Sequence, residues 1–326
     1  MSVRIQRRAA LGLLASAITA SSLDAFAQGG PDRVTVIVPY PPGIAPDLLA
    51  RILGAKMGAA TGKPTVVENR PGANAIIGSD YVSKARPYGS VLLVVDRMTT
   101  IVNPLLYSKL PYDPTQLQGV SDLAHVDLLL AVAGDAPFKN WQEFVAYAKA
   151  NPGKVTVDSG GLGSVHHLSM ELMARATGAQ FTHVPYKGVS AAVQDVLGGQ
   201  LVAVISGPEL LRGHVQSGKL KVLATGADQR SPLFPDAPTM CELGITTPVL
   251  LTTTLSLYAP PGLPKPLLDQ LSTTTRKLMA EPDVARQLSD TGLVPGSSTP
   301  DDMKTALAQL QPRLSTLVRD ANIKLD

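Results

Sequence analysis

Short apolar runs alternate with amphipathic segments along the first part of the chain. The residues of Val34–Val38 are all β-branched and are followed by prolines, which predicts a strand buried on both faces. Apolar residues then recur at helical spacing as far as Met57, and Pro46 suits the first turn of that helix. Further strands are predicted at residues 64–68 and 91–95, with a helix at 75–85 between them. This order predicts a doubly wound α/β unit.

The same pattern starts again after Leu123 and predicts a second α/β unit. Its strands are expected at residues 126–133, 154–157, 181–184, 201–205 and 220–225, with helices between them, one of them capped by Ser190. A strand at 255–259 and two amphipathic helices follow. We therefore predict two lobes, with residues 28–123 and 246–326 in one and residues 124–245 in the other. Because loops at strand ends belong to both lobes, a ligand cleft is expected between them.

The first 27 residues have the composition of a secretory signal. Three arginines precede an apolar run at residues 9–20, and Ala25-Phe26-Ala27 matches a small-x-small cleavage site. The apolar run is too short for a membrane span. Removal near Ala27 predicts an exported, periplasmic protein; the Arg7-Arg8 pair leaves Sec and twin-arginine export both open. Without this segment, which carries +2, the net charge falls from +3 to +1, which gives no support for nucleic-acid binding. Cys241 is the one cysteine, so no disulfide is expected.

Two loops carry the strongest chemical signals. The loop from Tyr40 to Ala45 follows a strand and precedes a helix whose first turn contains Asp47, so its amides suit an anion. The segment Asp158–Ser164 combines small residues with two hydroxyls, which also favours an anion cradle. Each loop is equally consistent with an ordinary strand–helix turn. Arg97, in a predicted loop at 96–100, is a candidate for a bidentate pair with a carboxylate, or for a salt bridge with Asp96.

Several motifs of enzymes are incomplete. Residues 213–219 have the spacing of a Walker A loop, but Leu220 replaces the required hydroxyl and the segment leads into a strand. Ser159 and Ser164 lie near His167, yet neither has the Gly-x-Ser-x-Gly frame of a hydrolase, and Ser164 is better explained as a helix cap. The histidines are scattered and give no metal-binding pattern. We therefore predict no catalysis, no cofactor and no metal.

The chain resembles the Bug-type (TctC-like) extracytoplasmic receptors of tripartite tricarboxylate transporters. The matching segments run in order through the whole mature chain. They are Val38-Pro39-Tyr40-Pro41-Pro42-Gly43 with Asp47, Val67-Glu68-Asn69-Arg70-Pro71-Gly72-Ala73, Leu110-Pro111-Tyr112-Asp113-Pro114, Ala148-Lys149-Ala150-Asn151-Pro152-Gly153-Lys154, His183-Val184-Pro185-Tyr186-Lys187-Gly188, Leu197-Gly198-Gly199-Gln200 and Pro235-Asp236-Ala237-Pro238-Thr239.

The resemblance implies a two-lobed α/β periplasmic-binding-protein fold (Venus flytrap, type II-like) with the ligand in the interlobe cleft. It also implies that the ligand is a small carboxylate and that the partner is a membrane permease of a tripartite tricarboxylate transporter. The ligand-binding residues carried over from the family are Tyr40, Gly43, Ile44, Ala45, Asp47, Arg97, Met98, Thr99, Ser159, Gly160, Gly163, Ser164, His167, Tyr186, Ser206 and Thr254.

The sequence departs from the family in these same loops. Asp96-Arg97-Met98 replaces a run of small residues, Ser206 stands at a commonly acidic position, and Thr254 stands at a commonly aromatic one. Gain of Arg97 and loss of the acid favour a more anionic or differently shaped ligand. The alternative function is a ligand-sensing subunit that feeds a two-component signalling system. An enzyme on this scaffold is disfavoured because no nucleophile, base and orienting group converge.

Overall fold

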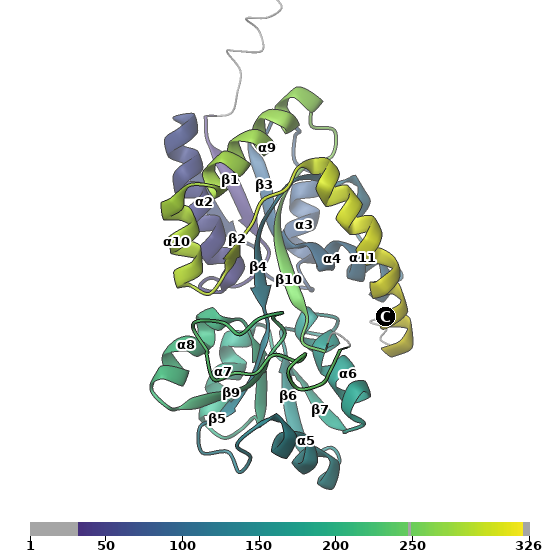
Figure 1. Cartoon of the computed structure of the whole chain (residues 1–326). Coiled ribbons are helices and arrows are strands. Elements are labelled where there is room, and N and C mark those ends of the chain that lie inside the picture. The colour runs from purple at the N-terminus through teal and green to yellow at the C-terminus, as the bar shows by residue number, and fades with distance from the viewer. Residues whose placement is uncertain (1–31, 247–248, 322–326) are drawn as a thin grey trace, which may run out of the picture.

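Two β-sheets, each covered by helices, form the two halves of the computed structural model (Figure 1). The structure describes residues 32–246 and 249–321, so the predicted signal peptide, residues 1–27, lies outside the described residues. We call the six-stranded sheet with its helices the first lobe, and the five-stranded sheet with its helices the second lobe.

The first lobe combines parallel and antiparallel strands in the order β11-β4-β10-β3-β1-β2. Strands β1, β2 and β3 pair in parallel, whereas β10 runs antiparallel to both β3 and β4. The strand bounds are β1 Val34–Val38, β2 Thr65–Asn69, β3 Val91–Asp96, β4 Gln118–Asp127, β10 Thr252–Ala259 and β11 Val294–Pro295. The helix bounds are α2 Ala45–Thr61, α3 Ile76–Ser83, α4 Arg97–Leu106, the short 3₁₀ helix η1 Pro114–Gln116, α9 Lys265–Met279, α10 Pro282–Asp290 and α11 Pro300–Ala321.

The second lobe has the strand order β7-β6-β8-β5-β9. Its strands are β5 Leu129–Ala133, β6 Val155–Ser159, β7 Phe181–Pro185, β8 Ala203–Ser206 and β9 Leu220–Thr225. Its helices are α5 Trp141–Ala150, α6 Val165–Thr177, α7 Val189–Leu197 and α8 Pro208–Gln216. The chain passes between the sheets at Leu128, from β4 to β5, and returns from β9 to β10.

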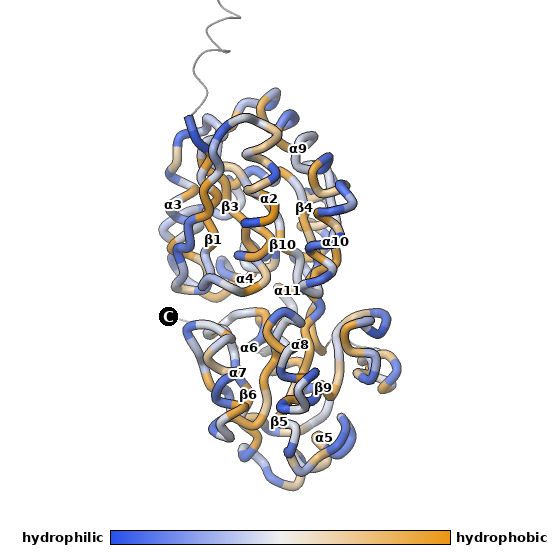
Figure 2. Tube along the Cα trace, turned by 90° about the vertical axis from the view of Figure 1, so that its left-hand side faces the viewer, coloured by the Kyte–Doolittle hydropathy of each residue, from blue (hydrophilic) through white to orange (hydrophobic). Residues whose placement is uncertain are grey.

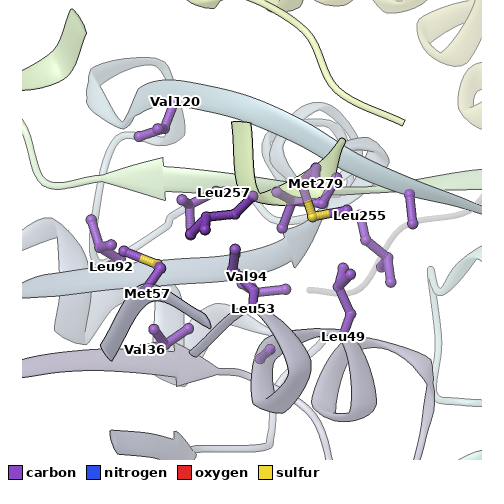
Figure 3. Packing of buried hydrophobic residues seen from close by; sticks show 14 of the residues in the cluster. Val36, Leu49, Leu53, Met57, Leu92, Val94, Val120, Leu255, Leu257 and Met279 are labelled. Atoms are coloured by element: carbon purple, nitrogen blue, oxygen red, sulfur yellow. The ribbon is translucent and has the colours of Figure 1, made fainter. Parts of the chain in front are cut away.

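The core of the first lobe lies between α2 and the central strands. Leu49, Leu53 and Met57 share one face of α2 and are almost fully buried, as their helical spacing predicts. Figure 3 shows them facing the apolar side chains of β1, β3 and β10, which include Val36, Val94 and Leu257. Burial of such side chains stabilises the lobe by about 1.5–3 kcal/mol each, which makes this interface its main source of rigidity.

The second lobe buries both faces of its sheet. Successive residues of β5 alternate between two cores: Leu130 and Val132 belong to one cluster, Leu129 and Ala131 to the other. Figure 2 shows the same arrangement in hydropathy, with orange strands inside and blue segments on the outer helices and turns. A strand enclosed on both sides reads in sequence as a continuous apolar run, which is why these strands were predictable.

Three local predictions were wrong. Residues 126–133 are not one strand, because Leu128 separates β4 from β5 and the two belong to different sheets. Residues 96–100 are not a loop: α4 begins at Arg97, and the carboxylate of Asp96 caps it by accepting a hydrogen bond from the Met98 amide at 2.9 Å. The cap of α7 is Gly188 rather than Ser190, which lies within the helix.

Candidate functional site

A cavity of about 740 Å³ lies between the two lobes, where the carboxyl ends of strands from both sheets meet. The first lobe lines it with the β1–α2 loop, residues 71–75 and the start of α4. The second lobe contributes residues 160–166, 186–189 and 206–210. The strands that pass between the lobes close the remaining side. This is the position in which open α/β sheets bind ligands.

Most of the cavity wall is apolar. Prolines, aromatic residues and aliphatic side chains from both lobes line it, among them Ile44, Leu128, Leu162 and Leu255. A volume of this size suits a small organic molecule whose body is held by apolar contacts and whose orientation is set by a few polar groups. The polar groups of the wall therefore decide which ligand the cavity accepts.

The β1–α2 loop does not present a free anion site. Its Gly43 amide donates to the carboxylate of Asp47 at 2.9 Å, and its Ala45 amide donates across the cavity to Oε1 of Glu209 at 3.3 Å. Asp47 is buried and also binds Arg51 and Asn69. Burial opposes ionisation, but these hydrogen bonds prevail and hold the pKa of Asp47 below its ordinary value. The protein's own carboxylates thus take the donors that the sequence assigned to a ligand.

The opposite wall is built on the N-terminus of α6. Ser164 is its cap and accepts a hydrogen bond from the His167 amide at 3.3 Å, as the sequence predicts. The preceding amide groups of Val165 and His166 face no acceptor within the described part of the chain, and both residues line the cavity. The start of α7 reaches the cavity in the same way through Gly188 and Val189. The second lobe therefore directs free helix N-termini at the ligand space.

Ser159 and His167 lie behind this wall. The His167 ring stacks on the His183 ring, with 4.1 Å between centroids, and its Nδ1 accepts a hydrogen bond from the Gly163 amide. Ser159 Oγ is 2.5 Å from Nε2 of His183. Burial and the neighbouring His183 lower the pKa of His167 to about 4, so its ring is neutral at pH 7. These residues support the loop at residues 160–164, and their side chains are already occupied.

Arg97 and Thr254 also lie outside the cavity wall. The Arg97 guanidinium donates to Asp122 at 2.8 Å, and both side chains are almost buried, at 14% and 12% exposure. Thr254 Oγ1 is bonded to His125 Nδ1 and to Arg97. Neighbouring residues of a strand point to opposite faces, so Thr253, not Thr254, lines the cavity. The prediction that Arg97 makes the cleft more cationic is corrected, because Asp122 neutralises its charge.

Half of the predicted site residues line the cavity, because loops were easier to predict than side-chain directions. Those on the wall are Tyr40, Ile44, Ala45, Thr99, Gly160, Ser164, Tyr186 and Ser206. Those outside it are Gly43, Asp47, Arg97, Met98, Ser159, Gly163, His167 and Thr254. Met98 instead packs in an apolar cluster with Val102 and Leu106 of α4.

Three titratable groups of the wall were not among the predicted site residues. They are Asp96, His166 and Glu209. Burial raises the pKa of Asp96 to about 6 and raises that of Glu209 above its ordinary value, while it lowers the pKa of His166 to about 4. Glu209 carried a readable signal, because an acid in the first turn of a helix that follows a buried strand lies at the sheet edge where the other loops gather.

The described residues offer neither a metal site nor a membrane span. Across residues 32–246 and 249–321, no group of three His, Cys, Asp or Glu side chains gathers closely enough to hold a metal ion. None of the helices in these ranges is both long and apolar enough to cross a membrane.

Comparisons with known proteins identify the scaffold. The family model described as "Tripartite tricarboxylate transporter family receptor" matches residues 49–323. The chain is 33% identical to protein BugT of Bordetella pertussis over 294 residues, which cover 90% of each protein. It superposes on the periplasmic binding protein BugD with a TM-score of 0.83 and 28% identity, covering 90% of this chain and 99% of BugD. It superposes on R. palustris Rpa4515, solved with adipate, with a TM-score of 0.84 and 28% identity, covering 90% and 98%.

These matches confirm the resemblance found in the sequence and the two-lobed periplasmic-binding-protein fold. The chain belongs to the receptor family of the tripartite tricarboxylate transporters.

Proposed function

We propose that this chain is a periplasmic receptor that captures a small organic acid between its lobes and delivers it to the permease of a tripartite tricarboxylate transporter. The observation that carries the proposal is the enclosed interlobe cavity with free helix amides on one wall. Family membership supports the transport role, and a relative solved with adipate supports a carboxylate ligand. The sequence of the first 27 residues supports export. The predicted lobe bounds, near residues 123 and 245, form part of this proposal.

The ligand carboxylate is expected at the N-terminus of α6. The amides of Val165 and His166 are its donors, and the Ser164 hydroxyl lies beside them on the wall. The macrodipole of the helix adds a favourable field for negative charge. The apolar wall excludes water around the bound acid, which strengthens each of these hydrogen bonds. The lobes then close on the ligand by hinge motion about the strands that join them.

One backbone donor can be removed without breaking the helix. Val165 is the first residue of α6, where proline is tolerated, and Ser164 has φ −65° and ψ 161°, which suits a residue before proline. Val165→Pro therefore deletes the amide and preserves the turn. Val165→Ala is the matched control, because it also shortens the side chain but keeps the amide. A lost hydrogen bond to a carboxylate is worth about 1.5–3 kcal/mol, so affinity should fall about tenfold to a hundredfold in the proline variant alone.

The measurement is a thermal-shift screen of the purified mature protein against mono-, di- and tricarboxylates and aromatic acids, with the corresponding uncharged amides as controls. Ligand at a hundredfold excess over Kd stabilises the native state by about 2.7 kcal/mol. Acids that raise Tm in the wild type and in Val165→Ala, but weakly in Val165→Pro, support the proposal. A screen in which no acid raises Tm above its amide control contradicts it.

A further inference from the structure

We propose that the ligand is an organic acid that also carries an ammonium group, and that Glu209 binds this group. The inference rests on the proposed function, since the carboxylate of the same ligand occupies the α6 end of the cavity. It specifies the substrate class: a zwitterion with an apolar body, rather than a plain mono- or dicarboxylate.

Glu209 presents an unused carboxylate oxygen to the cavity. It follows Pro208 in the first turn of α8, directly after the buried strand β8. Its Oε1 accepts the Ala45 amide from the other lobe, whereas its Oε2 is enclosed and has no hydrogen-bond partner within the described residues. A Cβ on Gly207 would lie 2.9 Å from the carboxyl carbon of Glu209, so the glycine leaves room for the side chain to fold back. An enclosed, unpaired carboxylate oxygen is unfavourable unless a donor reaches it.

The wall contains acids without a matching buried cation. The charged residues that line the cavity are Asp96, Glu209 and Lys187, and Lys187 is exposed to solvent. Arg97 cannot compensate, because Asp122 holds its guanidinium outside the wall. Burial raises the pKa of both acids, which reflects the lack of a nearby cation. A ligand ammonium supplies the missing charge.

His166 adds a second acceptor. Its Nδ1 is enclosed without a partner in the described chain, and burial keeps the ring neutral at pH 7. A neutral imidazole accepts at one nitrogen, so it can share the hydrogens of an ammonium with Glu209. The titratable groups that line the cavity around Glu209 are Tyr40, Asp96, Tyr107, His166, Tyr186 and Lys187. The Tyr186 hydroxyl is already committed, since it donates to Asp195 at 2.6 Å.

The test compares acids that differ only by an amino group. The pairs are phenylalanine and hydrocinnamate, leucine and isocaproate, aspartate and succinate, and glutamate and glutarate. Calorimetric titration of the purified mature protein measures Kd for each. At least one amino acid is expected to bind the wild type tenfold or more tightly than its partner lacking the amine. Tenfold corresponds to about 1.4 kcal/mol.

The variant Glu209→Gln keeps an acceptor for the Ala45 amide and removes the negative charge. It is expected to lose the preference for the amino acid by tenfold or more, with binding of the amine-free partner almost unchanged. Glu281→Gln is the matched control, because Glu281 lies away from the cavity wall and its partner Lys56 keeps Asp283. Circular dichroism checks that both variants are folded.

The outcomes separate the two proposals. If the amine-free acids bind as tightly as the amino acids, or if Glu209→Gln keeps the preference, the ammonium assignment is wrong while the carboxylate receptor stands. If Glu209→Gln binds the amine-free acids at least tenfold less tightly, Glu209 serves as a protonated donor to a carboxylate and the assignment is also wrong. If no acid of either kind binds, the proposed function itself fails and the inference fails with it.

Discussion

Asp158 is expected to make the protein less stable as the pH rises from 5 to 8. The side chain is fully buried at the end of β6, where Oδ1 accepts the Ile205 amide at 2.7 Å and Oδ2 has no partner within the described residues. Burial raises the pKa of Asp158 from 3.8 to about 8. The folded state then holds a proton that the unfolded state releases above pH 3.8, so the free energy of unfolding decreases with pH until the folded state also ionises.

The magnitude follows from the pKa difference. Each pH unit between the two pKa values removes about 1.36 kcal/mol, which amounts to about 1.6 kcal/mol at pH 5 and about 4 kcal/mol at pH 7. Asp158→Asn removes this penalty and introduces an unpaired amide group, which costs about 1–3 kcal/mol at every pH. The variant should therefore be close to the wild type in stability at pH 5 and about 2 kcal/mol more stable at pH 7.

Urea unfolding of both proteins at pH 5, 6, 7 and 8 measures this difference. Asp113→Asn is the control: hydrogen bonds from Thr115 lower the pKa of exposed Asp113, so its carboxylate is ionised in both states over this range and its difference should not vary with pH. An equally flat difference for Asp158→Asn would refute the reasoning, because it would mean that the buried carboxyl is ionised in the folded protein.

Two further changes separate stability from binding. Arg97→Met should lower the free energy of unfolding by about 3 kcal/mol in a urea titration, because Asp122 is left nearly buried without its cation, whereas Kd for the ligand should stay unchanged; a large loss of affinity would return Arg97 to the binding site. Gly78→Ala should cost about 1–3 kcal/mol in the same assay, since the new Cβ would lie 2.8 Å from Cβ of Pro39. Gly213→Ala, with nothing within 4 Å in helix α8, should instead stabilise by up to about 1 kcal/mol, and equal effects at both sites would contradict the packing argument.

The elements that sequence predicted well are those whose signal is local. Strands such as β1 and β3 read as continuous apolar runs because both faces are covered. Helix α4 was missed because its first turn is polar and Pro104 lies within it, although Asp96 at its start is a typical cap. A search for capping residues after each predicted strand would have found it.

The site was predicted at the level of loops but not of side chains. Loops that follow parallel strands gather at one sheet edge whatever their sequence, so the wall came from the right segments. Side-chain direction depends on register, and an error of one residue separates Thr253 from Thr254 and His166 from His167. The partner of Arg97 is 25 residues away on another strand, so local sequence gave no sign that its charge was taken.

The family scaffold and the ligand chemistry are decided by different residues. The scaffold depends on buried side chains such as Leu53 and Val94, whose loss costs several kcal/mol, so a shared fold preserves them. Residues at the strand ends face the cavity and contribute little to either core, so they can change without unfolding the protein. The absence of an acid at Ser206 therefore does not make the cavity less acidic, because Asp96 and Glu209 also line it. The polar atoms that the fold leaves unpaired, rather than the ligands of relatives, indicate what this receptor binds.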